Sequence, residues 1–196
     1  MYEKMKVRLI GIVPMLTHNA RLGDENSSYT TRLKQLIMEK KQAKNNITDK
    51  LLKSITQTEF EGGAYFDNEG KIMIPSDVME GMLANAGAKN AGTTKSQIVI
   101  SVMVPEHFYF TKVDGPLDIK KRFEEGFYDQ RVVALQKAKI LRTRQKITNW
   151  VAEGEIHYDT ELIDAEKIPD LLAAGGQKCG IGDYRPKFGR FEFEIL

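Results

Sequence analysis

The sequence predicts an α+β protein with a ferredoxin-like (RRM-like) β-α-β-β-α-β core. Segments rich in branched apolar residues, typical of strands, alternate with segments whose apolar residues recur at helical spacing. Once two insertions are set aside, the order is strand, helix, strand, strand, helix, strand. We expect a single domain over residues 1–196, with a helical insertion after the first strand at about 28–60 and a flap insertion at about 105–131.

The composition is that of a soluble globular protein, with 41% hydrophobic and 29% charged residues. The net charge is only +2, so any nucleic-acid-binding surface must come from local clustering of cations. A single cysteine excludes an internal disulfide framework and favours a reducing compartment. Because the sequence has no long apolar run and no apolar signal core, we expect a cytoplasmic protein without a membrane segment.

The N-terminal part is predicted to form a strand and then two helices. Residues 6–16 are rich in branched apolar residues and predict a strand buried on both faces. Apolar residues at helical spacing indicate amphipathic helices at 30–44 and 47–55. The first helix carries the lysines Lys40, Lys41 and Lys44. We expect them on a solvated helix face, and the alternative is that they line a nucleic-acid groove.

The polar loop at 17–28 carries the first candidate ligand-binding residues. His18 and Arg21 could contact phosphate groups. His18 could instead bind a metal ion together with Asp24 and Glu25. Their spacing matches no specific ligand pattern, so we predict neither a metal site nor a cofactor.

The middle of the chain begins with a short hairpin predicted at 62–74, around Asp67-Asn68-Glu69-Gly70. Ser76 is a good N-cap for a helix at 76–89. The buried face of that helix is expected to be Met79, Met82, Leu83 and Ala86. The Val and Ile content of 97–104 predicts the second core strand.

The remaining core elements lie in the C-terminal half. A strand could form at 107–112, but 120–126 are mixed in charge with little periodicity, and we expect 105–131 to be an insertion or flap outside the core. Strands are predicted at 151–159 and 189–195, and the second alternates Phe and Ile with Glu. A helix is predicted at 164–174, with Ile168, Leu171 and Leu172 facing inward.

The segment 175–191 is rich in glycine and holds four cations against one acid, Asp183. It follows a helix and precedes a strand, the reverse of a phosphate-binding P-loop, so a helix N-terminus is not available to a ligand. We expect a flexible loop whose backbone approaches a ligand closely, with Tyr184 and Phe188 stacking on bases. The alternative is that the glycines merely end a helix. Cys179 is interpreted as a small loop residue.

A second cationic cluster, at 136–147, contains five Lys or Arg and no acid. In a strand, Arg142, Arg144 and Lys146 would share one face, which fits a surface that follows phosphates. The alternative is an edge strand protected by charge against aggregation.

The segment Gly-Ile-Gly-Asp-Tyr-Arg-Pro-Lys-Phe-Gly-Arg-Phe, at 180–191, resembles the glycine-rich loop of the RAMP superfamily. These are RNA-binding proteins of CRISPR effector complexes. Residues 74–83 resemble the strand end and helix of that family, and 140–159 resemble its later core strands. Together these stretches cover about half of the chain. Both a backbone subunit and a stand-alone or mobile-element homologue fit this resemblance.

The resemblance implies a non-catalytic protein that binds single-stranded nucleic acid, such as a guide RNA, largely without reading its sequence. Its implied partners are copies of itself and other effector-complex subunits, and the nucleic acid is RNA or DNA. Our predicted contacts are His18, Arg21, Arg142, Arg144, Lys146, Lys178, Tyr184, Arg185, Lys187, Phe188 and Arg190. This hypothesis requires Arg142 and Arg185 to lie on one side of the molecule and to be free of carboxylates.

Two other functions remain open. A phage or mobile-element protein could imitate a subunit and inhibit a CRISPR complex by binding protein. A RAMP-type endoribonuclease would need a general base or a metal-binding acid, for which His18 and Asp24 are the candidates.

Overall fold

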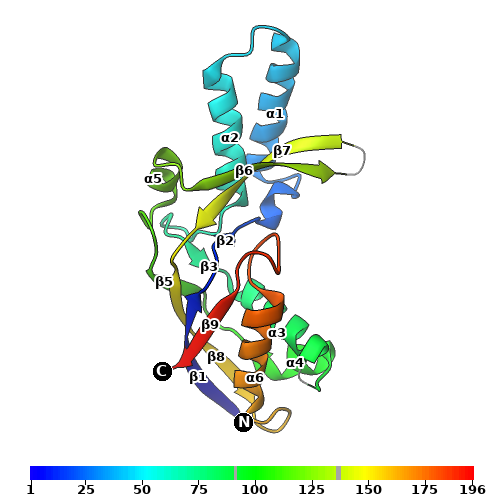
Figure 1. Cartoon of the computed structure of the whole chain (residues 1–196). Helices are drawn as coiled ribbons and strands as arrows, with labels where there is room; N and C mark the ends of the chain where they lie inside the picture. The colour runs from blue at the N-terminus through cyan, green and yellow to red at the C-terminus, as the bar shows by residue number, and fades with distance from the viewer. Residues whose placement is uncertain (91, 136–137) are drawn as a thin grey trace.

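The structure, a computed structural model, describes residues 1–90, 92–135 and 138–196 of the chain. It is an α+β protein whose strands form two antiparallel sheets (Figure 1). The larger sheet has the order β3-β5-β8-β1-β9, and β4 also pairs with β8. Its strands are β1 (Tyr2–Gly11), β3 (Met73–Ile74), β4 (Val102–Met103), β5 (Phe108–Lys112), β8 (Val151–Asp159) and β9 (Phe191–Ile195).

Strand β1 lies between β8 and β9. Its pairing with β8 runs from Tyr2 opposite Asp159 to Ile10 opposite Val151. Only alternate residues of β1, Val7 and Leu9, are fully buried, because no helix of the described residues covers the other face of the sheet (Figure 1). The prediction of a strand at 6–16 buried on both faces is therefore wrong, since β1 ends at Gly11 and is half-buried.

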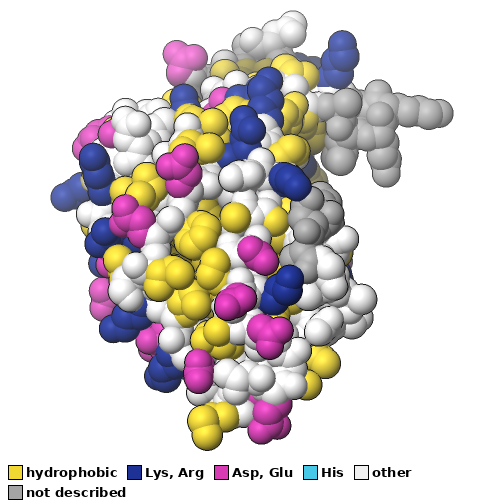
Figure 2. Space-filling model, turned by 60° about the horizontal axis from the view of Figure 1, so that its bottom comes forward, with side chains coloured by type: hydrophobic (Ala, Val, Ile, Leu, Met, Phe, Trp, Pro, Cys, Tyr) yellow, Lys and Arg dark blue, Asp and Glu magenta, His cyan; other side chains and the backbone are white. Residues whose placement is uncertain are grey.

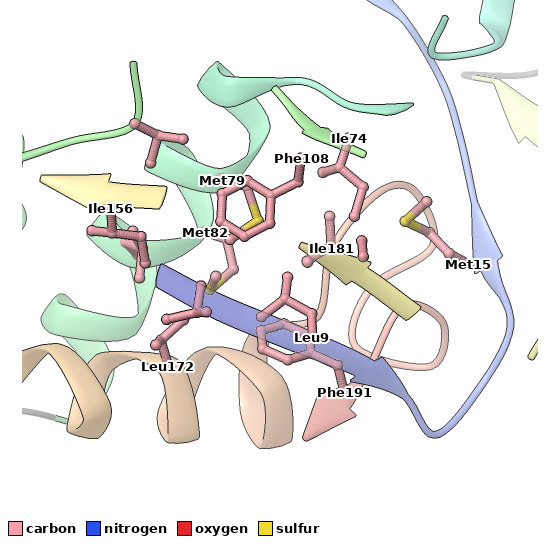
Figure 3. Close-up of a cluster of buried hydrophobic side chains, with 14 of the residues drawn as sticks. Leu9, Met15, Ile74, Met79, Met82, Phe108, Ile156, Leu172, Ile181 and Phe191 are labelled. Atoms are coloured by element: carbon pink, nitrogen blue, oxygen red, sulfur yellow. The ribbon is translucent and has the colours of Figure 1, made fainter. Parts of the chain in front are cut away.

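Helices α3 (Ser76–Asn90) and α6 (Lys167–Ala174) cover one face of the larger sheet. Figure 3 shows Met79 and Met82 of α3 and Leu172 of α6 directed toward Leu9 and Phe108 of the sheet. All five side chains are fully buried. The predicted inward faces of both helices are confirmed, because Leu83, Ala86, Ile168 and Leu171 are also buried.

The smaller sheet consists of β2 (Met15–Leu16), β7 (Ala138–Ile147) and β6 (Tyr128–Leu135), in the order β2-β7-β6. Strands β6 and β7 form a long antiparallel ribbon that projects from the body of the molecule (Figure 1). The second cationic cluster lies on β7, and its Lys137 falls outside the described residues.

Two helices extend the molecule beyond the ribbon. They are α1 (Ser28–Ala43) and α2 (Asp49–Gly63), preceded by the short helix η1 (Ala20–Leu22). The two amphipathic helices expected from the sequence are present, and they pack against each other as a hairpin (Figure 1). The Thr48 hydroxyl accepts from the Leu51 amide and caps the start of α2.

The strand predicted at 97–104 is wrong over most of its length. Residues Lys95–Ser101 form helix α4, and β4 begins only at Val102. The Thr94 hydroxyl accepts from the Gln97 amide and caps this helix. Among the apolar residues of α4, Ile98 is buried, while Val99 and Ile100 are exposed. The Val and Ile residues of this segment are therefore not the buried residues of a paired strand.

The prediction of a flap outside the core at 105–131 is also wrong, although the strand allowed at 107–112 is present as β5 (Phe108–Lys112). Strand β5 pairs with β3 and β8, and its Phe108 and Phe110 are buried. Helix α5 (Ile119–Glu124) buries Ile119, Phe123 and Arg122. The Arg122 guanidinium donates to three backbone carbonyls, those of Asp114, Pro116 and Lys146, at 2.8–2.9 Å. Burial lowers its pKa to about 10.

No helix within the described residues is long and apolar enough to cross a membrane.

Candidate nucleic-acid interface

The glycine-rich loop is packed against the protein and not free to fold over a ligand. It begins as η2 (Gly175–Cys179), which continues α6, and then crosses to strand β2. The Asp183 amide donates to the Leu16 carbonyl at 2.7 Å, and the Gly189 amide donates to the Pro14 carbonyl at 2.9 Å. The expectation of a flexible loop with open backbone is therefore wrong for this part.

Two glycines explain this packing. Gly182 has φ +81° and Gly189 has φ +72°, conformations that side chains rarely adopt. A Cβ atom at Gly182 would overlap the Leu16 carbonyl oxygen, and one at Gly189 would overlap the Ile181 carbonyl oxygen. These glycines thus let the loop backbone approach other protein backbone.

Arg144 of β7 is bound to the only acid of the loop. Its Nε atom donates to Oδ2 of Asp183 at 2.5 Å, and its side chain is nine-tenths buried. Burial by itself would raise the pKa of Asp183. Hydrogen bonds from the Tyr184 amide and Arg144 outweigh that effect, together with the charges of Arg144 and His18, so the pKa lies below its usual value.

Arg142, two residues earlier on the same strand, is bound to the buried carboxylate of Glu59 on α2. Its Nη1 atom lies 2.9 Å from Oε1 of Glu59, and Oε2 of Glu59 accepts from the Thr143 amide. The charges of Arg142 and Arg144 are therefore already compensated. Their predicted role as phosphate contacts is wrong in this structure, where they fasten the ribbon to α2 and to the loop.

The two aromatic residues of the loop do lie together, as the stacking hypothesis requires. Tyr184 and Phe188 meet edge to face with centroids 6.1 Å apart. The Arg131 guanidinium of β6 lies 5.1 Å from each ring centroid and is held by both oxygens of Asp129. Tyr184 remains 43% exposed, so part of its surface is open to a ligand.

Three cations of the loop, Arg185, Lys187 and Arg190, are exposed. Within the described residues, none of the three side chains has an ion-pair partner. Arg185 also lines a surface pocket of about 460 Å³ with Asn85, Lys178, Tyr184 and other loop residues. These cations are therefore available to an anion.

A comparison of the chain with protein-family models and with curated proteins found no match.

Of the other predicted contacts, His18 and Lys146 lie near the ion pairs of β7 and the acid Asp129, whereas Arg21 lies in a separate pocket. His18 lies near the Arg142–Glu59 and Arg144–Asp183 pairs, and its pKa is lowered, mainly by burial of its ring. Lys146 lies on β7, near enough to Asp129 for its charge to lower the pKa of that acid.

Arg21 is not part of this cluster. Its Nη2 atom donates to the Ala64 carbonyl at 2.7 Å, and its guanidinium lies over the Phe66 ring. It lines a separate pocket whose other charged residues include the acids Glu61, Asp67, Glu69 and Asp118. Such surroundings do not favour phosphate.

Glu59, Asp129 and Arg131 are not among the site residues predicted from the sequence. Glu59 lies on the apolar face of α2, four residues after Ile55, and a charge at such a position signals a buried partner. Asp129 and Arg131 have the spacing of strand neighbours on one face, in a segment predicted to be a flap. No group of three His, Cys, Asp or Glu side chains able to hold a metal ion occurs among the described residues.

Proposed function

We propose that this protein binds single-stranded nucleic acid through its glycine-rich loop, largely without reading the sequence. The observation that carries the proposal is the exposed set Arg185, Lys187 and Arg190, which has no carboxylate partner in the described chain. In the sequence, Arg185 and Lys187 lie between the two residues of the aromatic pair, and Arg190 follows two residues after it. Proteins that bind single-stranded nucleic acid combine aromatic rings with cations in this way. The hypothesis in its original form, with one track over β7 and the loop, required Arg142 to be free of carboxylates and therefore fails, because Glu59 holds Arg142 and Asp183 holds Arg144. The present proposal is a narrower one that rests on the glycine-rich loop alone.

The order of elements supports a ferredoxin-like core and membership of the RAMP superfamily as part of this proposal. Strands β1, β5, β8 and β9 stand in the sheet order β9-β1-β8-β5, with α3 and α6 on one face. The loop that resembles the RAMP loop lies between α6 and β9. In this proposal the ligand is a guide RNA, the partners are other subunits of a CRISPR-type complex, and the setting is the cytoplasm.

The test is binding of labelled single-stranded RNA and DNA homopolymers, measured by fluorescence anisotropy at several salt concentrations. The protein is first freed of bound nucleic acid by nuclease treatment and repurification. We expect Arg185→Ala/Arg190→Ala to weaken binding of all homopolymers alike. The slope of log affinity against log salt should fall by about 0.7 for each lost phosphate contact on a single strand.

The matched control is Lys120→Ala/Lys121→Ala, which removes two exposed cations from α5. This variant should bind like the wild type. Equal binding by wild type and the Arg185/Arg190 variant would remove the proposal. Cleavage of the RNA during the incubation, with or without magnesium, would instead favour the endoribonuclease.

A further inference from the structure

A surface pocket of about 460 Å³ lies between helix α3 and the glycine-rich loop. Its volume falls in the range of about 300–1,000 Å³ that is typical of small-ligand sites. Helix α3 contributes Asn85 to the lining, and the loop contributes Tyr184 and Arg185 among others. The pocket therefore borders the proposed nucleic-acid interface and adds a residue from a different element to it.

Close packing of α3 against the start of the loop puts Asn85 at this pocket. A Cβ atom at Gly175 would overlap Sδ of Met82 on α3, so the missing side chain lets Met82 pack against the first turn of η2. Asn85 follows Met82 by three residues, and side chains with this spacing are neighbours on one helix face. Met82 is fully buried, whereas Asn85, one turn later, reaches the pocket.

The side-chain amide of Asn85 has no hydrogen-bond partner within the part of the chain that the structure describes. The residue is partly buried and stands between the buried Ala84 and Ala86. A polar group that is withdrawn from water without a partner costs free energy. Because an amide offers an acceptor oxygen and N–H donors together, Asn85 suits a ligand that presents a donor beside an acceptor.

The charges around this pocket favour a nucleotide. Its one acidic lining residue, Asp183, is already bound by Arg144. Two other surface pockets, of about 530 and 430 Å³, are lined by three and four acidic side chains. At the end of the molecule opposite the α1–α2 hairpin, Figure 2 shows acidic side chains beside hydrophobic ones. Unpaired acids repel phosphate, so the pocket between α3 and the loop is the better place for it.

Tyr184 and Arg185 supply the two other contacts that a nucleotide needs. Tyr184 is 43% exposed, and its backbone is fixed because its amide donates to Oδ1 of Asp183 at 2.8 Å. Arg185 is exposed and has no ion-pair partner among the described residues. A base can stack on the tyrosine ring while the guanidinium binds a neighbouring phosphate.

We propose that this pocket binds one adenine base of a single-stranded nucleic acid and that the Asn85 amide selects it. Asparagine accepts a hydrogen bond from the N6 amino group of adenine and donates one to N7, and such a pair discriminates against the other bases. The inference rests on the proposed function. It adds a base preference at one position to an interface that otherwise does not read sequence.

The test uses nuclease-treated protein and short oligouridylates of equal length, one unmodified and the others carrying a single adenosine, cytidine or guanosine. Fluorescence anisotropy should show that the oligonucleotide with adenosine binds about tenfold more tightly than the other three. Purine riboside in place of adenosine lacks the N6 amino group and should abolish this advantage. That comparison uses the wild type alone, so it does not depend on the folding of a variant.

Asn85→Leu keeps a side chain of similar size but has neither donor nor acceptor. This variant should bind unmodified oligouridylate like the wild type and lose the preference for adenosine, and thermal unfolding checks its fold. The matched control is Gln35→Leu, which removes an exposed amide from α1 and should keep the preference.

Equal binding of all four oligonucleotides by the wild type would overturn the adenine pocket and leave the proposed function intact. An adenosine preference that persists in Asn85→Leu, or with purine riboside, would overturn the role of the Asn85 amide. If no oligonucleotide bound at all, the proposed function itself would fail, and the adenine pocket with it.

Discussion

Arg144 and Asp183 form a charge-assisted hydrogen bond of 2.5 Å that joins the middle of β7 to the glycine-rich loop. The same loop residue donates its backbone amide to Leu16 of β2, so strands β2 and β7 and the loop meet at this point. The only acid of a basic loop is thus a structural residue. It compensates a buried guanidinium and leaves the loop's exposed cations, Arg185 and Lys187, uncompensated.

Replacing Asp183 by alanine should destabilise the protein substantially. The change leaves the nine-tenths-buried charge of Arg144 without its partner. We expect a loss of about 3 kcal/mol in the free energy of unfolding, at the low end for breaking a buried pair because Asp183 is partly exposed. Urea denaturation measures this loss.

The control for Asp183→Ala is Glu25→Ala, which breaks the exposed pair between Glu25 and Lys34. An exposed pair contributes at most about 1 kcal/mol, so this variant should unfold near the wild-type midpoint. Similar losses in the two variants would show that the Arg144–Asp183 pair does not hold the loop.

His18 should titrate below its ordinary pKa of 6.5. Burial of the ring is the main cause, and the charges of Arg142 and Arg144 act in the same direction. The unfolded chain binds a proton on the His18 ring more readily than the folded protein does. At a pH above the pKa of His18 in the unfolded chain, the ring is neutral in both states and does not affect stability. Stability should fall as pH drops from that value through the folded pKa.

An NMR titration of the His18 ring protons measures this pKa directly. The charge of Asp183 raises the pKa of His18, so Asp183→Asn should lower it further. An unchanged titration in that variant would show that the two groups are not neighbours. His157→Gln, which alters a histidine on the open face of the larger sheet, is the control for assignment.

Glycine positions in the loop can be tested with a pair matched in backbone conformation. Gly182 and Gly126 both have φ +81°. A Cβ at Gly126 would meet nothing within 4 Å, whereas one at Gly182 would overlap the Leu16 carbonyl oxygen. In Gly126→Ala, the free energy of unfolding should therefore fall by about 1–2 kcal/mol, which is the cost of placing a side chain at this positive φ.

Gly182→Ala should lower the free energy of unfolding more than Gly126→Ala does, because the loop must also move away from β2. The difference between the two, measured by urea denaturation, isolates the close approach of the backbones. Equal losses of stability in the two variants would mean that the close approach of the loop to β2 does not contribute to stability.

Local patterns predicted the elements whose residues carry their own signals. The strand predicted at 189–195 from the alternation of Phe and Ile with Glu is present as β9, and the helix predicted at 76–89 is present as α3. The helix at 95–101 was missed because β-branched Val99 and Ile100 favour a strand, while the Thr94 cap decides otherwise. Propensity is a weak guide where a cap or packing opposes it.

The site was predictable only in part for a different reason. The tyrosine and phenylalanine of the loop were found because they are four residues apart in one segment. Arg142 and Glu59 are separated by 83 residues, and no local pattern shows that the carboxylate of α2 reaches β7. Cationic clusters in a sequence therefore overstate the charge available to a ligand until their acidic partners are located.

Arg122 is another cation that is already bound within the protein, in this case inside the core. Its replacement tests whether residues 105–131 belong to the core. Its guanidinium is fully buried, lies over the Phe127 ring and donates to three backbone carbonyls. Arg122→Met keeps much of the apolar stem but leaves those carbonyls without donors. We expect a loss of about 3 kcal/mol or more, since each buried unsatisfied group costs about 1–3 kcal/mol. Lys121→Met, one residue earlier and exposed, should change stability by less than about 0.5 kcal/mol. If urea denaturation gave both variants the wild-type midpoint, residues 105–131 would not be part of the cooperative core.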